Sequence, residues 1–232
     1  MEGYAYLGII ILAGLVLASL QTPLGTLLLL YHSSLSKHVR PKTKRLASSY
    51  ISGVTLTNFL LVSTITLLIA ELASGLSKTI LSVVLGVLVA LALISWCFYY
   101  KRGTTTELWF PRQLAKYLSS HAKSTTNESE AYTLGLAVPF VEFLFSFPLL
   151  LLAGDAVLHL PTDFAALGLV AFTVISVLPL VVLRLALRSG RTVAEIQRWR
   201  LRNKTFQRVF TGFGFLVLAG FLLAFVILGG AA

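Results

Sequence analysis

The sequence has few charged residues and almost no cysteine. Charged side chains make up 12% of its 232 residues, whereas a soluble domain usually carries about 25%. Cys97 is the only cysteine, so an internal disulfide is impossible. The four histidines lack the spacing of metal ligands, and no catalytic triad, Walker motif or dinucleotide fingerprint occurs. We therefore expect neither an enzyme nor a bound metal or cofactor.

Long apolar runs occupy most of the chain. A helix needs roughly 20 apolar residues to cross a bilayer core of about 30 Å. Six segments reach about this length, and they cover residues 6–31, 46–70, 79–100, 131–153, 164–183 and 205–228. The first is too long for the core of a cleaved signal peptide, so we interpret it as a permanent helix. The sequence predicts an all-α integral membrane protein with six transmembrane helices.

Basic residues gather in alternate connections between these helices. Of the 19 Lys and Arg residues, all except Lys78 lie in 37–45, 101–123 and 184–208. With six helices these connections share one side of the membrane, which the positive-inside rule assigns to the cytoplasm. We expect a multi-pass protein of the cytoplasmic (inner) membrane with both termini outside. Orientation by charge explains the net charge of +10 without nucleic acid binding.

The longest connection, 101–130, is a predicted cytoplasmic loop. Its residues 108–121 can form an amphipathic helix, with apolar side chains on one face and basic ones on the other. An interfacial helix is the interpretation that we favour, and a partner-binding helix is the alternative. Asn127, with Glu130 three residues later, matches the start of the next helix.

The two halves of the chain resemble each other. Lys78 and Lys204 each open a helix, and a glycine follows eight residues later in both. A proline precedes a run of leucines in the first and fourth helices. We interpret 1–100 and 131–232 as two three-helix repeats, in the 3+3 inverted arrangement of many secondary transporters. Close helix approach is also predicted at three glycines of the last helix, Gly212, Gly214 and Gly220.

Glu142 is the most informative polar residue. It lies near the centre of the fourth predicted helix, roughly 16 Å from either end at 1.5 Å per residue. A carboxylate at this depth costs about 3 kcal/mol or more, so it should face the bundle interior or a wet cavity. It is either a proton or cation site, or a protonated acid bonded to a neighbouring helix. Pro139 and Pro148 flank it, and the carbonyls that they free can line a cavity.

Other polar residues fall at similar depth. Gln21 and Thr22 precede Pro23 in the first helix, and the repeat places Gln21 close to the counterpart of Ser146. Asn58 belongs to a polar stripe on the second helix, where helix packing is the alternative role. The predicted substrate- or ion-binding residues are Glu142, Gln21, Thr22, Asn58 and Ser146, with helix breaks at Pro23, Pro139 and Pro148.

Three features resemble the LysE-type superfamily of small membrane transporters, which includes the CcdA-like thiol-disulfide transporters. They are the stretch 21–53 with its Pro-Leu-Gly and basic segment, the stretch 207–220 of the last helix, and the 3+3 repeat. The resemblance implies the fold of that superfamily. Only Pro23 and Gly25 remain of its Pro-Gly-Pro-like segment. The cysteines that CcdA-like proteins carry in helices 1 and 4 are missing, which argues against a thiol relay.

We therefore expect a secondary transporter that exports a small solute, such as an amino acid or a cation, with Glu142 at the midplane site. The alternatives are a non-transporting membrane scaffold and a cysteine-less relative of the CcdA-like proteins with a changed role. The expected partners are the lipid bilayer and a small-molecule or ion substrate. A homo-oligomer is left open.

Overall fold

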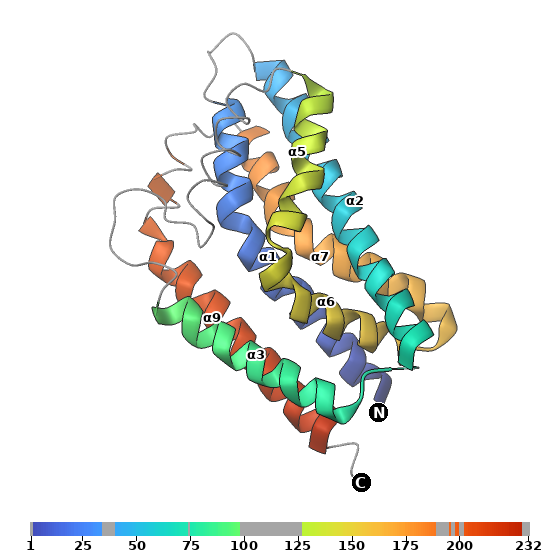
Figure 1. The fold of residues 1–232 in the computed structure, drawn as a ribbon. Coiled ribbons are helices and arrows are strands. Elements are labelled where there is room, and N and C mark those ends of the chain that lie inside the picture. The colour runs from blue at the N-terminus through green and yellow to red at the C-terminus, as the bar shows by residue number, and fades with distance from the viewer. Residues whose placement is uncertain are drawn as a thin grey trace.

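The computed structural model describes residues 2–33, 40–73, 75–97, 127–188, 195, 198–199 and 202–228, and this part of the chain contains helices but no strand (Figure 1). The helices are α1 (Glu2–Ser33), α2 (Arg40–Ala73), α3 (Lys78–Cys97), α5 (Glu128–Val141), α6 (Phe143–Leu158), α7 (Thr162–Arg188), α9 (Lys204–Leu222) and the π-helical η2 (Leu223–Leu228). The predicted interfacial helix at 108–121 lies outside the described residues.

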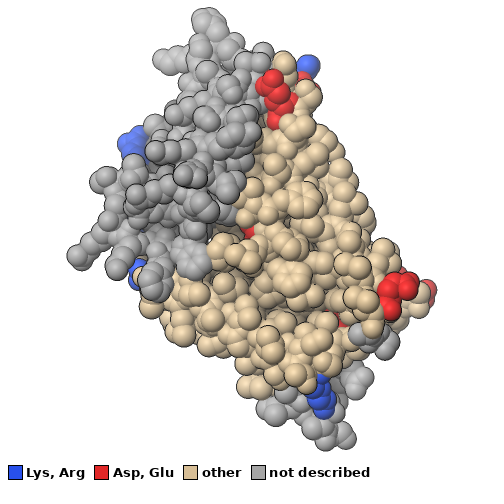
Figure 2. Space-filling view, in the orientation of Figure 1, with Lys and Arg blue, Asp and Glu red and all other residues tan. Residues whose placement is uncertain are grey.

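Five of these helices are long and apolar enough to cross a membrane, and they contribute the spans Gly3–Thr22, Arg45–Leu72, Lys78–Cys97, Thr162–Ala186 and Thr205–Val226. Their outward side chains are apolar, and Val83, Leu178 and Phe213 are each at least half exposed. On the face drawn in Figure 2, most charged residues lie towards the margins of a broad uncharged band. The prediction of a multi-span helical membrane protein is confirmed.

The sixth predicted span is broken. Helices α5 and α6 meet at Glu142 with a bend of 78°. Near the start of α5, Glu128 Oε1 lies 3.8 Å from Arg45 Nη1 in α2. Near the end of α6, Asp155 Oδ1 accepts a hydrogen bond of 2.7 Å from the amide of Leu76, just beyond the end of α2. The bent pair therefore runs the whole length of α2, which is the geometry of one interrupted crossing.

The helices form a central group and a flanking pair. Helices α1, α2, α5, α6 and α7 pack together, whereas α3 and α9 lie side by side along one flank, with α9 next to α1 (Figure 1). Both termini lie at the same end of the bundle, as an even number of crossings requires. Apolar side chains gain little by leaving lipid for a helix contact, so the packing must come from close fit and hydrogen bonds.

Small residues supply that close fit. Gly53 of α2 faces the backbone of Tyr132 and Gly135 in α5, and Gly135 faces the carbonyl of Tyr50. A methyl group at either glycine would collide with backbone atoms. In the flanking pair, the indole edge of Trp96 in α3 lies directly over Gly212 of α9.

The glycines of the last helix therefore differ in role. Gly212 and Gly214 both approach a neighbouring helix, the latter with Val16 of α1 about 3.0 Å from the place of an added Cβ. At Gly220, no atom of the described residues lies within 4 Å of that place. Close approach is confirmed at the first two positions, and the described part of the chain makes none at Gly220.

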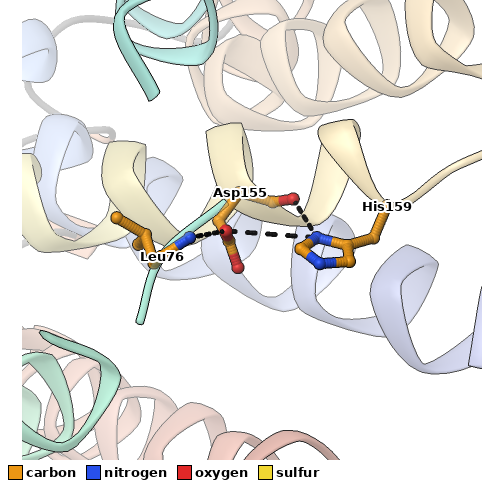
Figure 3. A network of polar contacts seen from close by, with 3 residues as sticks. All are labelled: Leu76, Asp155 and His159. Atoms are coloured by element: carbon orange, nitrogen blue, oxygen red, sulfur yellow. Dashed lines mark hydrogen bonds and ion pairs between the residues drawn. The ribbon is translucent and has the colours of Figure 1, made fainter. Parts of the chain in front are cut away.

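A polar contact fastens the connection between α2 and α3 to the end of α6 (Figure 3). Asp155 holds the amide of Leu76, and its own backbone carbonyl lies 2.9 Å from Nδ1 of His159. The ring of His159 stacks on Tyr6 of α1 at a centroid distance of 4.6 Å. Gly75 adopts φ 132°, a conformation that side chains rarely allow, and so lets the connection turn against this contact.

Candidate functional site: a polar layer at the helix break

The buried apolar side chains form two clusters. Along α2, residues 47–54 belong to the smaller cluster and residues 62–69 to the larger one. Along α7 the order is reversed, with Phe172 in the larger cluster and Val177 in the smaller. In the broken span, the smaller cluster takes residues from α5 and the larger takes residues from α6. The two clusters therefore lie one above the other along the bundle.

Buried polar residues occupy the boundary between these clusters. The central helices contribute one principal residue each: Gln21 from α1, Asn58 from α2, Glu142 from the break and Ser176 from α7. We call these four residues the polar layer. Each lies well inside its helix or broken span, so the layer is close to the middle of the bundle.

Three members of the polar layer form one hydrogen-bonded group. The Gln21 and Asn58 amides bind each other reciprocally, with Nε2 donating to Oδ1 and Nδ2 donating to Oε1, both at 3.1 Å. Asn58 Nδ2 also donates to Ser176 Oγ at 3.0 Å. The Ser176 hydroxyl in turn donates to the carbonyl of Thr173 at 2.8 Å. The group joins α1, α2 and α7 by side chains that would otherwise be unsatisfied in an apolar interior.

The backbone of Glu142 joins the two half-helices. Its amide donates to the carbonyl of Val138 at 3.1 Å, and its carbonyl accepts the amides of Phe145 and Ser146, each at 3.0 Å. Glu142 is thus the C-cap of α5 and the N-cap of α6. The carbonyls at the end of α5 and the amides at the start of α6 converge on this residue, so groups of opposite partial charge flank it.

One carboxyl oxygen of Glu142 is left without a partner among the described residues. The residue is 4% exposed, and its Oε2 makes no hydrogen bond to any residue that the structure describes. It does not cap α6 by a side-chain hydrogen bond. A buried carboxyl with a free oxygen is costly unless something else binds it, whether a proton, a water molecule, an ion or a substrate.

Tyr50 is a second unpartnered polar residue near Glu142. It lies in α2, its side chain is fully buried, and its hydroxyl makes no hydrogen bond within the described part of the chain. Tyr50 belongs to the same buried cluster as Val138 and Val141, the residues of the last turn of α5 that lead into Glu142. Near the break, two buried oxygens, one from α2 and one from the interrupted span, therefore have no partner among the described residues.

The predicted site residues are distributed unevenly. Gln21 and Asn58 bind each other directly, and Glu142 lies at the same level. Thr22 and Ser146 donate to carbonyls of their own helices, those of Ala18 at 2.6 Å and Phe143 at 3.3 Å.

The break does not fall at a proline. Pro139 lies inside α5 and Pro148 inside α6, with the interruption between them at Glu142. Pro23 lies within the range of α1, but its side chain is outside the described residues.

Sequence reasoning missed Ser176 and Tyr50. Ser176 could have been identified from the sequence, because it and Thr173 are polar residues in the middle of an apolar segment and lie one turn apart on a helix. Tyr50 could not, because a tyrosine near the end of a predicted span is typical of the membrane interface.

Comparisons with protein-family models, with curated proteins and with solved structures find no match to this chain. Within the described residues, no group of three or more His, Cys, Asp or Glu side chains could hold a metal ion. The polar layer offers one carboxyl, two amides and one hydroxyl, and the neighbouring Tyr50 adds a phenol.

Proposed function

We propose that this protein is a secondary transporter, an exporter of a small solute, and that the polar layer is its central binding site. The observation that carries the proposal is Glu142, a buried carboxyl with a free oxygen at the interruption of a membrane-spanning helix. Discontinuous helices with polar residues at the midplane form substrate and ion sites in many transporters. A packed scaffold needs neither the break nor an unsatisfied acid. The resemblance to the LysE-type superfamily points to the same class.

The pairing of helices supports an inverted repeat. In a 3+3 repeat, the first three spans are equivalent to the broken span, α7 and α9 in that order. The contact between α2 and α5 then corresponds to the contact between α7 and α1, and both are extensive. The repeat makes α3 and α9 equivalent to each other, so the symmetry exchanges these two helices and maps the contact between them onto itself. This is the pattern that a two-fold axis in the membrane plane produces.

Two glycines give the repeat a residue-level alignment. Gly14 of α1 faces the carbonyl of Phe172 in α7, and Gly135 of α5 faces the carbonyl of Tyr50 in α2. Gln21 and Glu142 each follow their glycine by seven residues. This alignment makes Gln21 the counterpart of Glu142, rather than of Ser146. The two half-sites would then differ in one respect, an amide in one half and a carboxyl in the other.

The test is transport by purified protein in liposomes. A panel of amino acids and monovalent cations is offered to the wild type, and any solute that moves is then offered to Glu142→Gln. The amide keeps the size of the side chain and removes its charge, so we expect a folded variant that has lost transport or its dependence on pH. Glu128→Gln, an acid at the exposed start of α5, is the matched control and should transport normally.

Unchanged transport by folded Glu142→Gln across pH would contradict the proposed role of the carboxyl. If the wild type moves no solute of the panel, the scaffold alternative is favoured.

A further inference from the structure

The oxygens around the helix break form an incomplete shell. Glu142 Oε2 and the Tyr50 hydroxyl are both buried, and neither has a hydrogen-bond partner in the described structure. They come from different elements, and Tyr50 belongs to the same buried cluster as Val138 and Val141, the residues of the last turn of α5 that lead into Glu142. Two buried oxygens beside the helix break thus lack a partner among the described residues, and a bound ligand would satisfy both.

The backbone carbonyls at the end of α5 directly precede Glu142 in the chain. Helix α5 ends at Val141, and the last carbonyls of a helix lack intrahelical donors and carry its negative dipole end. Pro139 removes one further donor, the amide that would have bound the carbonyl of Gly135. Carboxylate, hydroxyl and carbonyl oxygens are ligands of hard cations, and the C-terminal ends of half-helices coordinate sodium ions in transporters.

The charge at the break limits the valence of the ion. Glu142 is the only acidic residue among the buried polar residues of the layer, and Asp155 lies away from it at the end of α6. One carboxylate neutralises one positive charge, whereas a divalent ion would leave a net charge buried in the membrane. Gln21 and Asn58 already satisfy each other, so their oxygens are not needed for the shell.

We propose that the Glu142 carboxylate and the Tyr50 hydroxyl, together with carbonyls at the end of α5, bind a monovalent cation of the size of sodium. The proposal deepens the proposed function, on which it rests, by naming the coupling ion of the same site. No covalent step is involved, because the ion exchanges its water for protein oxygens and returns it on release.

Binding can be measured without transport. The full-length protein in detergent is unfolded thermally at increasing NaCl, with choline chloride holding the ionic strength constant. We expect the wild-type Tm to begin rising near the Kd and then to increase with the logarithm of the sodium concentration, by about 3–6 °C when sodium is tenfold above its Kd. Glu128→Gln should show the same rise, and Glu142→Gln should show none.

Tyr50→Phe separates a ligand from a packing residue. Without sodium this variant should be more stable than the wild type, because it removes a buried hydroxyl that has no partner. With sodium, its rise in Tm should require a several-fold higher concentration. Tyr4→Phe, at a tyrosine that is 81% exposed, is the control and should behave as the wild type.

Three outcomes would overturn the cation site. The first is a folded wild type whose Tm does not respond to sodium. The second is a Glu142→Gln variant whose Tm responds to sodium as strongly as that of the wild type. The third is a Tm that rises when the pH is lowered but not when sodium is added, which would identify a proton as the ligand. A normal sodium response in Tyr50→Phe would remove Tyr50 from the site. A sodium response that depends on Glu142, in a protein that moves no solute, would preserve the cation site and contradict the transporter.

Discussion

Gln21 and Asn58 hold each other by two reciprocal hydrogen bonds, each 3.1 Å long, across the interface between α1 and α2. An amide pair of this kind satisfies both side chains at once and fixes the register of the two helices. The same Asn58 amide reaches Ser176 of α7, so one side chain links three helices.

The first prediction concerns this link. In a double-mutant cycle, Gln21→Ala and Asn58→Ala should couple by about 1 kcal/mol, the range found for hydrogen bonds between membrane helices. The free energy of unfolding in mixed micelles is the measurement. Ser52→Ala, at an exposed residue that bonds only within α2, is the control and should change stability by less than about 0.5 kcal/mol. Independent effects of the two substitutions would show that the pair is not formed.

The second prediction concerns the crossing of α2 and α5. Gly135→Ala places a methyl group against the Tyr50 carbonyl, and Gly53→Ala places one against the Tyr132 carbonyl. Backbone atoms cannot move aside by changing a rotamer, so each variant should lose about 1–3 kcal/mol. Gly86→Ala is the control, because its added Cβ meets nothing within 4 Å. It should be neutral or stabilising by up to about 1 kcal/mol. Equal stabilities for all three variants would refute the close crossing.

The third prediction concerns the flanking pair. Gly212→Ala should loosen α3 from α9, because the new methyl group meets the indole edge of Trp96. Here the obstacle is a side chain, so a second substitution can relieve it. Trp96→Leu in the Gly212→Ala background should recover part of the lost thermal stability. Destabilisation by Trp96→Leu alone, with no recovery in the double variant, would argue against the contact.

The fourth prediction concerns the contact of Figure 3. Asp155→Ala removes the acceptor of the Leu76 amide and should cost about 1.5–3 kcal/mol, the range for a hydrogen bond to a charged group. Asp155→Asn keeps an acceptor oxygen and should retain most of that stability. Thermal unfolding of the two variants side by side is the measurement. Similar losses in both would mean that the charge matters more than the hydrogen bond to Leu76.

The fifth prediction concerns orientation. Single cysteines replacing Lys42, Lys116 and Arg200, in a Cys97→Ser background, should resist an impermeant thiol reagent applied to intact cells. Ser77→Cys, in the exposed connection between α2 and α3, should react. The reverse pattern of labelling would place the basic segments outside.

The helices were predictable because the bilayer imposes their length. Five apolar segments and the outline of the sixth follow from hydropathy alone, since a membrane permits few alternatives to a helix. Some of the observed helices are longer than the predicted spans. For example, α1 begins at Glu2 rather than residue 6, because a helix continues beyond the apolar core into the polar interface.

The details of the site were less predictable. Buried polar side chains such as Gln21, Asn58 and Glu142 are conspicuous in an apolar sequence, so their importance could be anticipated. Which of them meet depends on the rotation of each helix, and no local pattern encodes that rotation. For this reason Ser176 was missed. Two prolines indicated a weak region in the span, but the bend falls between them.

The depth of the polar layer has an electrical consequence. Glu142 lies about halfway along its broken span, so a cation that reaches it from either face crosses about half of the transmembrane voltage. At 100 mV this fraction is equivalent to about 1.2 kcal/mol per elementary charge, or about a sevenfold change in occupancy. The resting potential of a cell would thus load the site from one face and unload it towards the other. The fraction of sites at the break that hold a cation would depend on the membrane potential as well as on the ion concentration.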